Sequence, residues 1–361
     1  MRLAAILLSV VYVNTQAQTV IPFSSPRWEI KGDEAKQENF DGKACIKITN
    51  GSAVLKDAGF TNGIIEFDME VTKARYFPGM SFRMQDTNNT EAFYVRPHQS
   101  GNPDAMQYYP EYNGAGGWQL YYGDGFGNAH FIPFDRWFHV KLLVKDTSAE
   151  LYLDNEQKPA LFIKKLYRPV KSGMIALENP WPVAARYANF AYTETNEVTL
   201  QSKPVNARPL PPGVFTDWQV SSPFDEALLK NQAALSGIHI NNLSWQNVSP
   251  DDRGIVNLDK LAPVLPNKNT VFAKIVIHSD KEVVKKLDFG FSDRVNLYFN
   301  GTLLYSGADG FMSRDYRFLG TLGLYDAVYL HLKKGDNEVV LAVSESFGGW
   351  GVMAMLEDWQ E

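Results

Sequence analysis

Short runs of alternating apolar and polar residues, separated by Gly, Pro, Asn and Asp, dominate this chain of 361 residues. Such alternation puts apolar side chains on one face of a strand and polar side chains on the other, and the breaks are typical of turns. In the run 137–144, for example, Phe138, Val140, Leu142 and Val144 share the face that we assign to the core. The pattern predicts an all-β protein built of antiparallel strands.

The expected strands fall into two groups. The first group comprises 64–71, 91–96, 118–122, 137–144 and 150–153, and the second comprises 215–220, 271–279, 286–290, 294–299 and 338–343. A short helix is expected at 224–234. The pair Asn300-Gly301 predicts a β-hairpin, because both residues tolerate the positive φ angles of a type I′ turn.

A proline-rich stretch separates the two groups of strands. The sequence TETNEVTLQSKPVNARPLPPG contains prolines 204, 209, 211 and 212, which remove backbone donors and stiffen the chain. We therefore expect two β-sandwich (jelly roll) domains in tandem, at 18–195 and 214–361, joined by a Pro-rich linker at 196–213.

The N-terminus has the features of a signal peptide. Met1-Arg2 is followed by an apolar run at 3–13 that polar residues then end. The run is too short to span a bilayer, which needs about 20 apolar residues, and no later stretch is long enough. We expect residues 1–17 to be cleaved after Ala17 and the mature chain to be secreted or periplasmic, without a membrane span.

Composition narrows the partners and the source of stability. Cys45 is the only cysteine, so no intramolecular disulfide can form, and stability must come from a core that 45% hydrophobic residues can supply. The net charge of −6 argues against nucleic acid or an anionic membrane as partner. No feature of the sequence identifies a protein partner.

The first group of strands resembles a known family. The series FTNGIIEFDMEV, YFPGMSFRMQD and PFDRWFHVKLLVKDTSAELYLDN is similar to the concanavalin A-like lectin/glucanase (laminin G-like) jelly roll of secreted bacterial proteins, over 24–192. This resemblance implies a β-sandwich that contacts carbohydrate. The family includes lectins, adhesion modules, glycosidases and lyases, so the fold alone does not fix an activity.

One candidate catalytic site is a row of acids on the strand 64–71. Glu66, Asp68 and Glu70 alternate and so project from one face, as in the Glu-x-Asp-x-Glu motif of retaining glucanases of this fold. That similarity implies Glu66 as nucleophile and Glu70 as acid/base. The alternative is an outward row of solvated acids that follows from ordinary inside/outside patterning.

A second candidate site is a dense group of aromatic and polar residues between 83 and 122. An aromatic ring can stack on a pyranose, and Arg, Asp or Gln can bind its hydroxyls, so this composition is typical of a sugar site. Paired arginines would favour an acidic sugar. The candidate ligand-binding residues are Arg83, Tyr94, Arg96, His98, Asp104, Gln107, Tyr108, Trp118 and Tyr121.

The same group permits two other interpretations. His98 with Tyr94, Tyr108 or Glu111 can supply a base and an acid for β-elimination of a uronic acid, while an arginine neutralises the carboxylate. Alternatively, Arg96, His98 and Asp104 only hold a long loop on the sandwich.

No cofactor is indicated by a motif. The resemblance allows a structural calcium ion, for which Asp86, Asn88, Asp124 and Asn128 are oxygen donors, although no calcium-loop spacing is present. The histidines form neither an HxH nor an HExxH pair, so zinc is not expected.

The second group of strands resembles another family. The pieces FTDWQVSSPF, FGFSDRVNLYFNGTLLY, YLHLKKGDNEVVLAV and FGGWGVMAML are similar to the galactose-binding-like jelly roll of secreted glycosidases. Together the resemblances imply a secreted protein that binds a poly- or oligosaccharide on its first domain. The alternatives are a glycoside hydrolase or polysaccharide lyase, and a non-catalytic adhesion or structural module.

Overall fold

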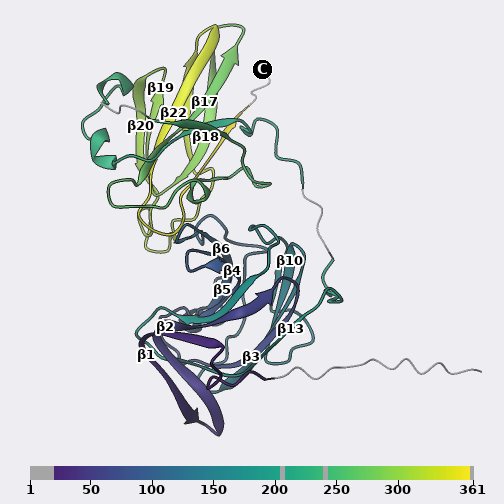
Figure 1. Ribbon diagram of the computed structural model, residues 1–361. Coiled ribbons are helices and arrows are strands. Elements are labelled where there is room, and N and C mark those ends of the chain that lie inside the picture. The colour runs from purple at the N-terminus through teal and green to yellow at the C-terminus, as the bar shows by residue number, and fades with distance from the viewer. Residues whose placement is uncertain (1–19, 204–207, 239–242, 358–361) are drawn as a thin grey trace, which may run out of the picture.

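Two β-sandwiches, one above the other in Figure 1, make up the protein. The computed structural model describes residues 20–203, 208–238 and 243–357. Within these ranges the only helical elements are short 3₁₀ turns, so the expected fold class, all-β with two β-sandwiches, is confirmed. None of these turns is long and apolar enough to cross a membrane. The expected signal peptide lies outside the described residues.

The first sandwich contains strands β1 to β13. Their bounds are β1 Trp28–Phe40, β2 Lys43–Phe60, β3 Gly63–Glu70, β4 Gly79–Asp86, β5 Asn89–Val95, β6 Met106–Tyr112, β7 Ala115–Gly116, β8 Gly127–Asn128, β9 Trp137–Lys145, β10 Ser148–Leu153, β11 Leu161–Ile163, β12 Gly173–Asn179 and β13 Ala185–Glu194, with a 3₁₀ turn η1 at Pro97–Gln99.

Strand β2 joins the two layers of this sandwich. Its first half pairs with β13 and its second half with β12, so one layer runs β11-β10-β9-β3-β13 and the other runs β12-β4-β5-β6-β7. β1 pairs with β2 from Lys43 to Leu55, and within this pair a Cβ on Gly51 would lie 2.2 Å from the Lys31 carbonyl oxygen. Only glycine permits this close approach of two backbones.

The core lies between the two layers. Phe67 and Tyr187 contribute from the first layer, with ring centroids 5.8 Å apart, and Phe82 and Phe93 contribute from the second. The face of β9 that the alternation assigned to the core is buried, as expected, at Phe138, Val140, Leu142 and Val144. The outer face of the second layer is therefore left to form a surface.

The second sandwich contains strands β14 to β23. A sheet in the order β15-β14-β17-β22-β19-β20 packs on a smaller sheet in the order β16-β23-β18-β21. The bounds are β14 Trp218–Ser221, η2 Glu226–Leu229, η3 Leu235–Gly237, β15 Trp245–Val248, β16 Val256–Asn257, η4 Leu258–Lys260, β17 Thr270–Ser279, β18 Val283–Ser292, β19 Arg294–Phe299, β20 Thr302–Ala308, β21 Asp326–Leu332, β22 Gly335–Ser344 and β23 Gly351–Leu356.

The expected hairpin is present. β19 and β20 pair directly, and the turn residues Asn300 and Gly301 have φ angles of 48° and 86°. Positive φ at both positions is the geometry that a type I′ turn requires.

Two expected elements are wrong. Residues 224–234 contain only the 3₁₀ turn η2, because Asp225 caps its first turn and Lys230 already has extended φ and ψ angles. Residues 118–122 form turns instead of a strand, with the Leu120 and Tyr121 N–H groups both donating to the Gly117 carbonyl. This segment lacks a solvent face because it is buried between the two sandwiches.

Gln119 is the centre of the contact between the sandwiches. Its side chain is 1% exposed, and its Nε2 donates to the Leu319 carbonyl at 2.9 Å. Its backbone N–H donates to Gly348 O at 2.9 Å, and its carbonyl accepts from Leu322 N at 2.9 Å. Further hydrogen bonds across this boundary run from Asn113 to Asp259 O, from Arg253 to Leu120 O and from Asn257 to Tyr121 Oη.

We expect Gln119→Ala to loosen this contact by about 1–3 kcal/mol, because the substitution leaves a buried carbonyl without its donor. Hydrogen–deuterium exchange would show faster exchange at the Leu322 N–H. The matched control is Gln85→Ala, since the Gln85 amide donates only within the first sandwich, to Arg83 O and Ser172 O. Unchanged exchange at Leu322 in Gln119→Ala would contradict the assignment.

Candidate functional site

A cleft of about 1300 Å³ lies between the outer face of the layer β12-β4-β5-β6 and the loops of the second sandwich. Figure 1 shows this layer at the top of the first lobe, facing those loops. The first sandwich contributes Arg75, Phe77, Tyr94, Arg96, His98, Asp104, Tyr109, Glu111, Trp118, Tyr122, Glu178 and Trp181. The second contributes Val264, Phe311, Met312, Tyr316, Arg317, Leu319, Glu345, Ser346, Phe347 and Gly348.

The register of the strands builds the floor of the cleft. Gly79 on β4 pairs with Tyr94 on β5 and with Glu178 on β12, so the side chains of Tyr94 and Glu178 share a face. Tyr109 and Glu111 follow at two-residue intervals from Gln107, the β6 partner of Tyr94. Because side chains alternate along a strand, all of them point to the outer face.

Arg96 forms a cationic end of this floor. The side chain is 5% exposed, and its guanidinium donates to Asp104 O at 2.7 Å, to Tyr94 Oη at 2.6 Å and to Gln107 Oε1 at 2.7 Å. These acceptors are neutral, and no ion pair to Arg96 is found among the described residues. The Asp104 carboxylate lines the same end of the cleft, where its charge acts on the pKa of His98 in the opposite direction to that of Arg96. The exposed Arg75 adds a second positive charge nearby.

Gln107 connects the arginine to the loop that carries Trp118. It accepts from Arg96, and its Nε2 donates at 2.7 Å to both Trp118 O and Tyr121 O. The Gln107 side chain is 1% exposed and lies beneath the floor. It thus positions Arg96 and Trp118 without lining the cleft itself.

His98 lies beside the arginines, with its ring 5.7 Å from that of Phe77 in an edge-to-face arrangement. Burial, and then the charges of Arg75 and Arg96, lower the pKa of His98. The imidazole is therefore neutral at neutral pH. Its Nδ1 is buried without a hydrogen-bond partner among the described residues.

Two carboxyl groups stand apart from this cationic end. Burial, and then the charge of Glu178, raise the pKa of Glu111 to about 7. Burial also raises the pKa of Glu178, against the effect of the Ser81 hydroxyl that donates to Glu178 Oε2 at 2.8 Å. Both side chains are partly exposed in the cleft.

Aromatic rings lie on the floor of the cleft and on the side formed by the second sandwich. On the floor, Tyr94 lies 5.4 Å from Tyr109 and Phe77 lies 4.9 Å from Trp181, measured between centroids. Opposite them, Trp118 of the first sandwich meets Phe347 of the second at 5.8 Å. The cleft thus exposes rings from both sandwiches.

Buried acids hold the loop that carries Phe347. Asp293 Oδ2 accepts from Ser346 N at 3.0 Å and from Phe347 N at 3.2 Å, and Glu345 Oε1 accepts from Gly349 N at 3.3 Å. Burial, and then the neighbouring Asp293, raise the pKa of Glu345 well above its usual range. The loop is therefore fixed by groups inside the second sandwich.

Four of the nine predicted ligand-binding residues do not line the cleft: Arg83, Gln107, Tyr108 and Tyr121. Arg83 is 1% exposed at the end of the sandwich, where it donates to Thr61 O and Asp146 O. Tyr108 is in the core and donates to Glu91 at 2.6 Å, whereas Tyr121 accepts from Asn257 at the domain contact. Gln107 lies beneath the cleft, and the others, Tyr94, Arg96, His98, Asp104 and Trp118, line it.

Glu66, Asp68 and Glu70 lie on the outer face of the other layer, away from the cleft. Each has a cationic partner: Glu66 pairs with Lys141 at 3.3 Å, Asp68 with Lys43 at 2.6 Å and Glu70 with Arg186 at 2.8 Å. His139 lies between the first two, with Nδ1 2.9 Å from Asp68 Oδ1. A catalytic role for this row stays a prediction; what the structure shows is ion pairing.

The candidate calcium donors lie in separate turns. Asp86 accepts from the backbone of Asn88, Asp124 pairs with Lys164, and Asn128 donates to Ala160 O at 2.7 Å. Within the described ranges, no group of at least three His, Cys, Asp or Glu side chains is arranged to hold a metal ion.

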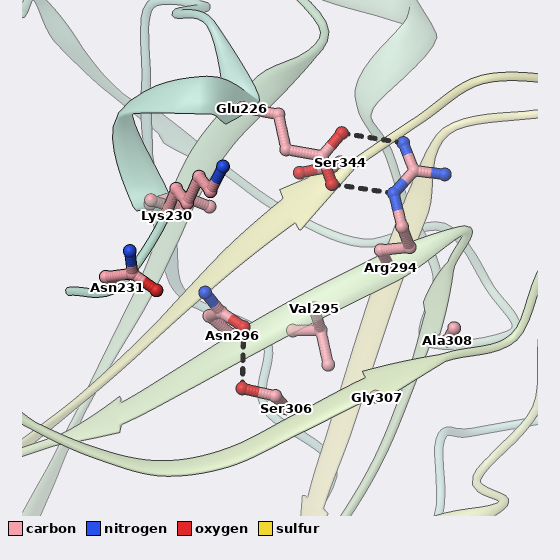
Figure 2. Close-up of a pocket in the computed structure, with 11 residues that line it drawn as sticks. Glu226, Lys230, Asn231, Arg294, Val295, Asn296, Ser306, Gly307, Ala308 and Ser344 are labelled. Atoms are coloured by element: carbon pink, nitrogen blue, oxygen red, sulfur yellow. Dashed lines mark hydrogen bonds and ion pairs between the residues drawn. The ribbon is translucent and has the colours of Figure 1, made fainter. Parts of the chain in front are cut away.

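A smaller hollow of about 400 Å³ lies on the second sandwich (Figure 2). Four of its polar side chains already bind one another: Arg294 donates to both carboxylate oxygens of Glu226, at 2.6 and 2.8 Å, and Ser306 donates to Asn296 at 2.7 Å. A ligand there would have to break these pairs, so the large cleft is the better candidate.

The sequence analysis missed several cleft residues. Glu178 and Trp181 are distant in sequence from the 83–122 group, and Phe311, Tyr316 and Phe347 belong to the other sandwich. The alternation in GMIALEN, with a single acid on an outer face, is the one signal that pointed to Glu178. The domain contact that brings in the other rings has no local signature.

Comparisons with known proteins found no matching family model and no matching curated protein. Solved structures similar to the chain include a carbohydrate-binding module from Bacillus subtilis, with a TM-score of 0.33 and 14% identity over 46% of this chain and 96% of that one. Galectin LEC-6 from Caenorhabditis elegans has a TM-score of 0.30 and 10% identity, over 41% of this chain and 96% of that one. Domain 4 of the Geobacillus stearothermophilus arabinanase AbnA has a TM-score of 0.29 and 12% identity, over 46% of this chain and 80% of that one.

The His139 network generates a pH prediction. Hydrogen bonds with Asp68 and then Glu66 raise the pKa of His139 from 6.5 to about 9. The stabilisation is fully present below pH 6.5 and is lost as the pH rises through about 9. We expect His139→Gln to be most destabilising near pH 6 and nearly neutral above pH 9, as measured by urea unfolding across about pH 6 to 9.5.

The control for this experiment is His331→Gln, which changes an exposed histidine of β21. The free energy of unfolding of His331→Gln should vary with pH as that of the wild-type protein does. A cost of His139→Gln that stays constant over this pH range would contradict a charged His139.

Proposed function

We propose that this protein is secreted and binds a poly- or oligosaccharide in the cleft between its two sandwiches. The observation that carries this proposal is the combination of aromatic rings from both sandwiches with polar side chains on the floor of one cleft. A pyranose presents an apolar face that stacks on rings and hydroxyls that need hydrogen bonds. The cleft offers both kinds of contact at once.

The cleft has a size suited to several sugar units. Its volume of about 1300 Å³ is larger than the usual small-molecule pocket of about 300–1,000 Å³. A chain of sugars is therefore a better match than a single small metabolite. The resemblance of the two halves to concanavalin A-like and galactose-binding-like domains agrees with such a ligand.

The cationic end supports an acidic saccharide. Arg96 is buried with neutral acceptors only, and Arg75 is exposed in the same part of the cleft. A carboxylate or sulfate on the ligand would supply an anionic partner through charge-assisted hydrogen bonds. A ligand such as polygalacturonate or chondroitin sulfate provides this group on every repeat.

We expect Trp118→Ala to weaken binding about tenfold, because it removes a stacking ring worth about 1.4 kcal/mol. Affinity electrophoresis and calorimetry on residues 18–361 would measure this, with polygalacturonate, chondroitin sulfate, xylan and cellulose oligomers as ligands. The matched control is Tyr329→Ala, an exposed ring of β21 far from the cleft. Equal affinities of the two variants would contradict the assignment.

We expect Arg75→Gln to weaken binding of the acidic polysaccharides selectively, by about three- to tenfold at low salt, and to leave neutral ones unchanged. The control is Lys73→Gln, which removes an exposed charge two residues away and outside the lining of the cleft. Equal losses for neutral and acidic ligands would contradict a charge contact. Absence of binding across the panel would leave the adhesion or structural role.

A further inference from the structure

Glu111 and Glu178 occupy opposite sides of the floor of the cleft. Glu178 extends from β12 and Glu111 from β6, the first and last strands of the order β12-β4-β5-β6. Tyr109 lies two residues from Glu111 on β6, and its phenol senses the charge of both carboxyls. A sugar lying across this floor would therefore have one carboxyl on each side.

These carboxyls differ from the acids on the other layer. Glu70 and Asp68 are each held by a cation at 2.8 Å or less, whereas no Lys or Arg in the described ranges forms an ion pair with the Glu111 or Glu178 carboxyl. Among the described residues, the one side-chain hydrogen bond to these two carboxyls is the one that Ser81 donates to Glu178 Oε2. The acids of the β3 row are therefore ion-paired, whereas the Glu111 and Glu178 carboxyls have no ion-pair partner among the described residues.

The environment favours the protonated forms of both carboxyls. Burial, and then repulsion from Glu178, raise the pKa of Glu111 to about 7, and burial raises that of Glu178. Two nearby carboxyls cannot both ionise freely, because the charge of one disfavours the charge of the other. A protonated acid beside an ionised one is the state that general acid and base catalysis needs.

We propose that Glu111 and Glu178 hydrolyse a glycosidic bond of the saccharide held in the cleft. This inference rests on the proposed function, since the substrate is the ligand of the same cleft. Glu111 is assigned as the acid, because it carries no hydrogen bond from a neighbouring hydroxyl, and Glu178 as the base, because the Ser81 hydroxyl stabilises its carboxylate.

The step balances with water as the co-reactant. Glu111 donates its proton to the glycosidic oxygen, the bond between that oxygen and the anomeric carbon breaks, and the leaving sugar departs as an alcohol. Water attacks the anomeric carbon and its proton passes to Glu178. Transfer of that proton through solvent to Glu111 restores the starting state. One water is consumed for each bond, and two hydroxyls are formed.

The other candidate groups fit this step less well. His98 is neutral and packed against Phe77, with Nδ1 buried, and the cleft places it with the arginines at the other end. Glu66 and Glu70 lie on the opposite face of the sandwich with cationic partners. Glu111 and Glu178 both line the cleft, and neither carboxyl forms an ion pair with a Lys or Arg of the described residues.

The test measures binding and product release together in wild type, Glu111→Gln and Glu178→Gln, on the panel of polysaccharides above. We expect each substitution to reduce the release of reducing ends by at least about 100-fold and to change affinity by less than about threefold. Reaction in H₂¹⁸O should place one ¹⁸O on the new reducing end. The control Glu197→Gln alters an exposed acid outside the cleft and should keep full activity.

Each outcome decides a different claim. Wild-type binding without any product would overturn the hydrolytic pair and leave the proposed function intact, whereas absence of binding would overturn both. Products that persist in Glu111→Gln and Glu178→Gln would overturn the assignment of the residues. Unsaturated products without ¹⁸O would show β-elimination and overturn hydrolysis. Far-UV circular dichroism and thermal unfolding of each variant separate a chemical effect from misfolding.

Discussion

The turn around Gln119 of the first sandwich is buried against the second sandwich, and this contact brings the two sides of the cleft together. Gln119 engages Leu319, Leu322 and Gly348 through both its backbone and its side chain. A buried amide with all of its groups paired holds its neighbours in one geometry, because any displacement leaves a donor or acceptor unsatisfied. The position of Trp118, one residue earlier, follows from this constraint. Without it the two walls of aromatic rings would not face each other.

Charge is distributed in opposite ways on the two outer faces of the first sandwich. On the layer that contains β3, the acids Glu66, Asp68 and Glu70 are interleaved with cations, so that face is locally neutral and braced. On the layer that forms the cleft, neither Arg96 nor Glu111 has an ion-pair partner among the described residues, although Asp104 lies near Arg96 and Arg168 near Glu111. Charged groups without an ion-pair partner cost stability in the free protein and leave contacts for a ligand. The same fold thus has one face built for stability and one for contact.

Features that depend on local periodicity could be predicted from the sequence. Features that depend on the contact between the two sandwiches could not. Alternation identified the buried face of β9, and Asn300-Gly301 identified a hairpin, because both depend on neighbours in the chain. The segment 118–122 has the same alternation, yet it is a buried turn, since its surroundings come from residues about 200 positions away. Arg83 shows the same limit: a bulge in β4 turns it toward Asp146 and away from Arg96. Tertiary context, not propensity, decides such positions.

Buried acids hold the loop of the second sandwich that carries Phe347 and faces the floor of the cleft. Asp259, Asp293 and Glu345 accept backbone N–H groups of the loop that carries Phe347, and burial raises the pKa of each. A neutral carboxyl avoids most of the cost of burying a charge and still accepts hydrogen bonds from the backbone. The loop is consequently held by the interior of the second sandwich and not by the ligand. A ring that is already in place loses little entropy when a saccharide stacks on it, so a modest contact area can yield useful affinity.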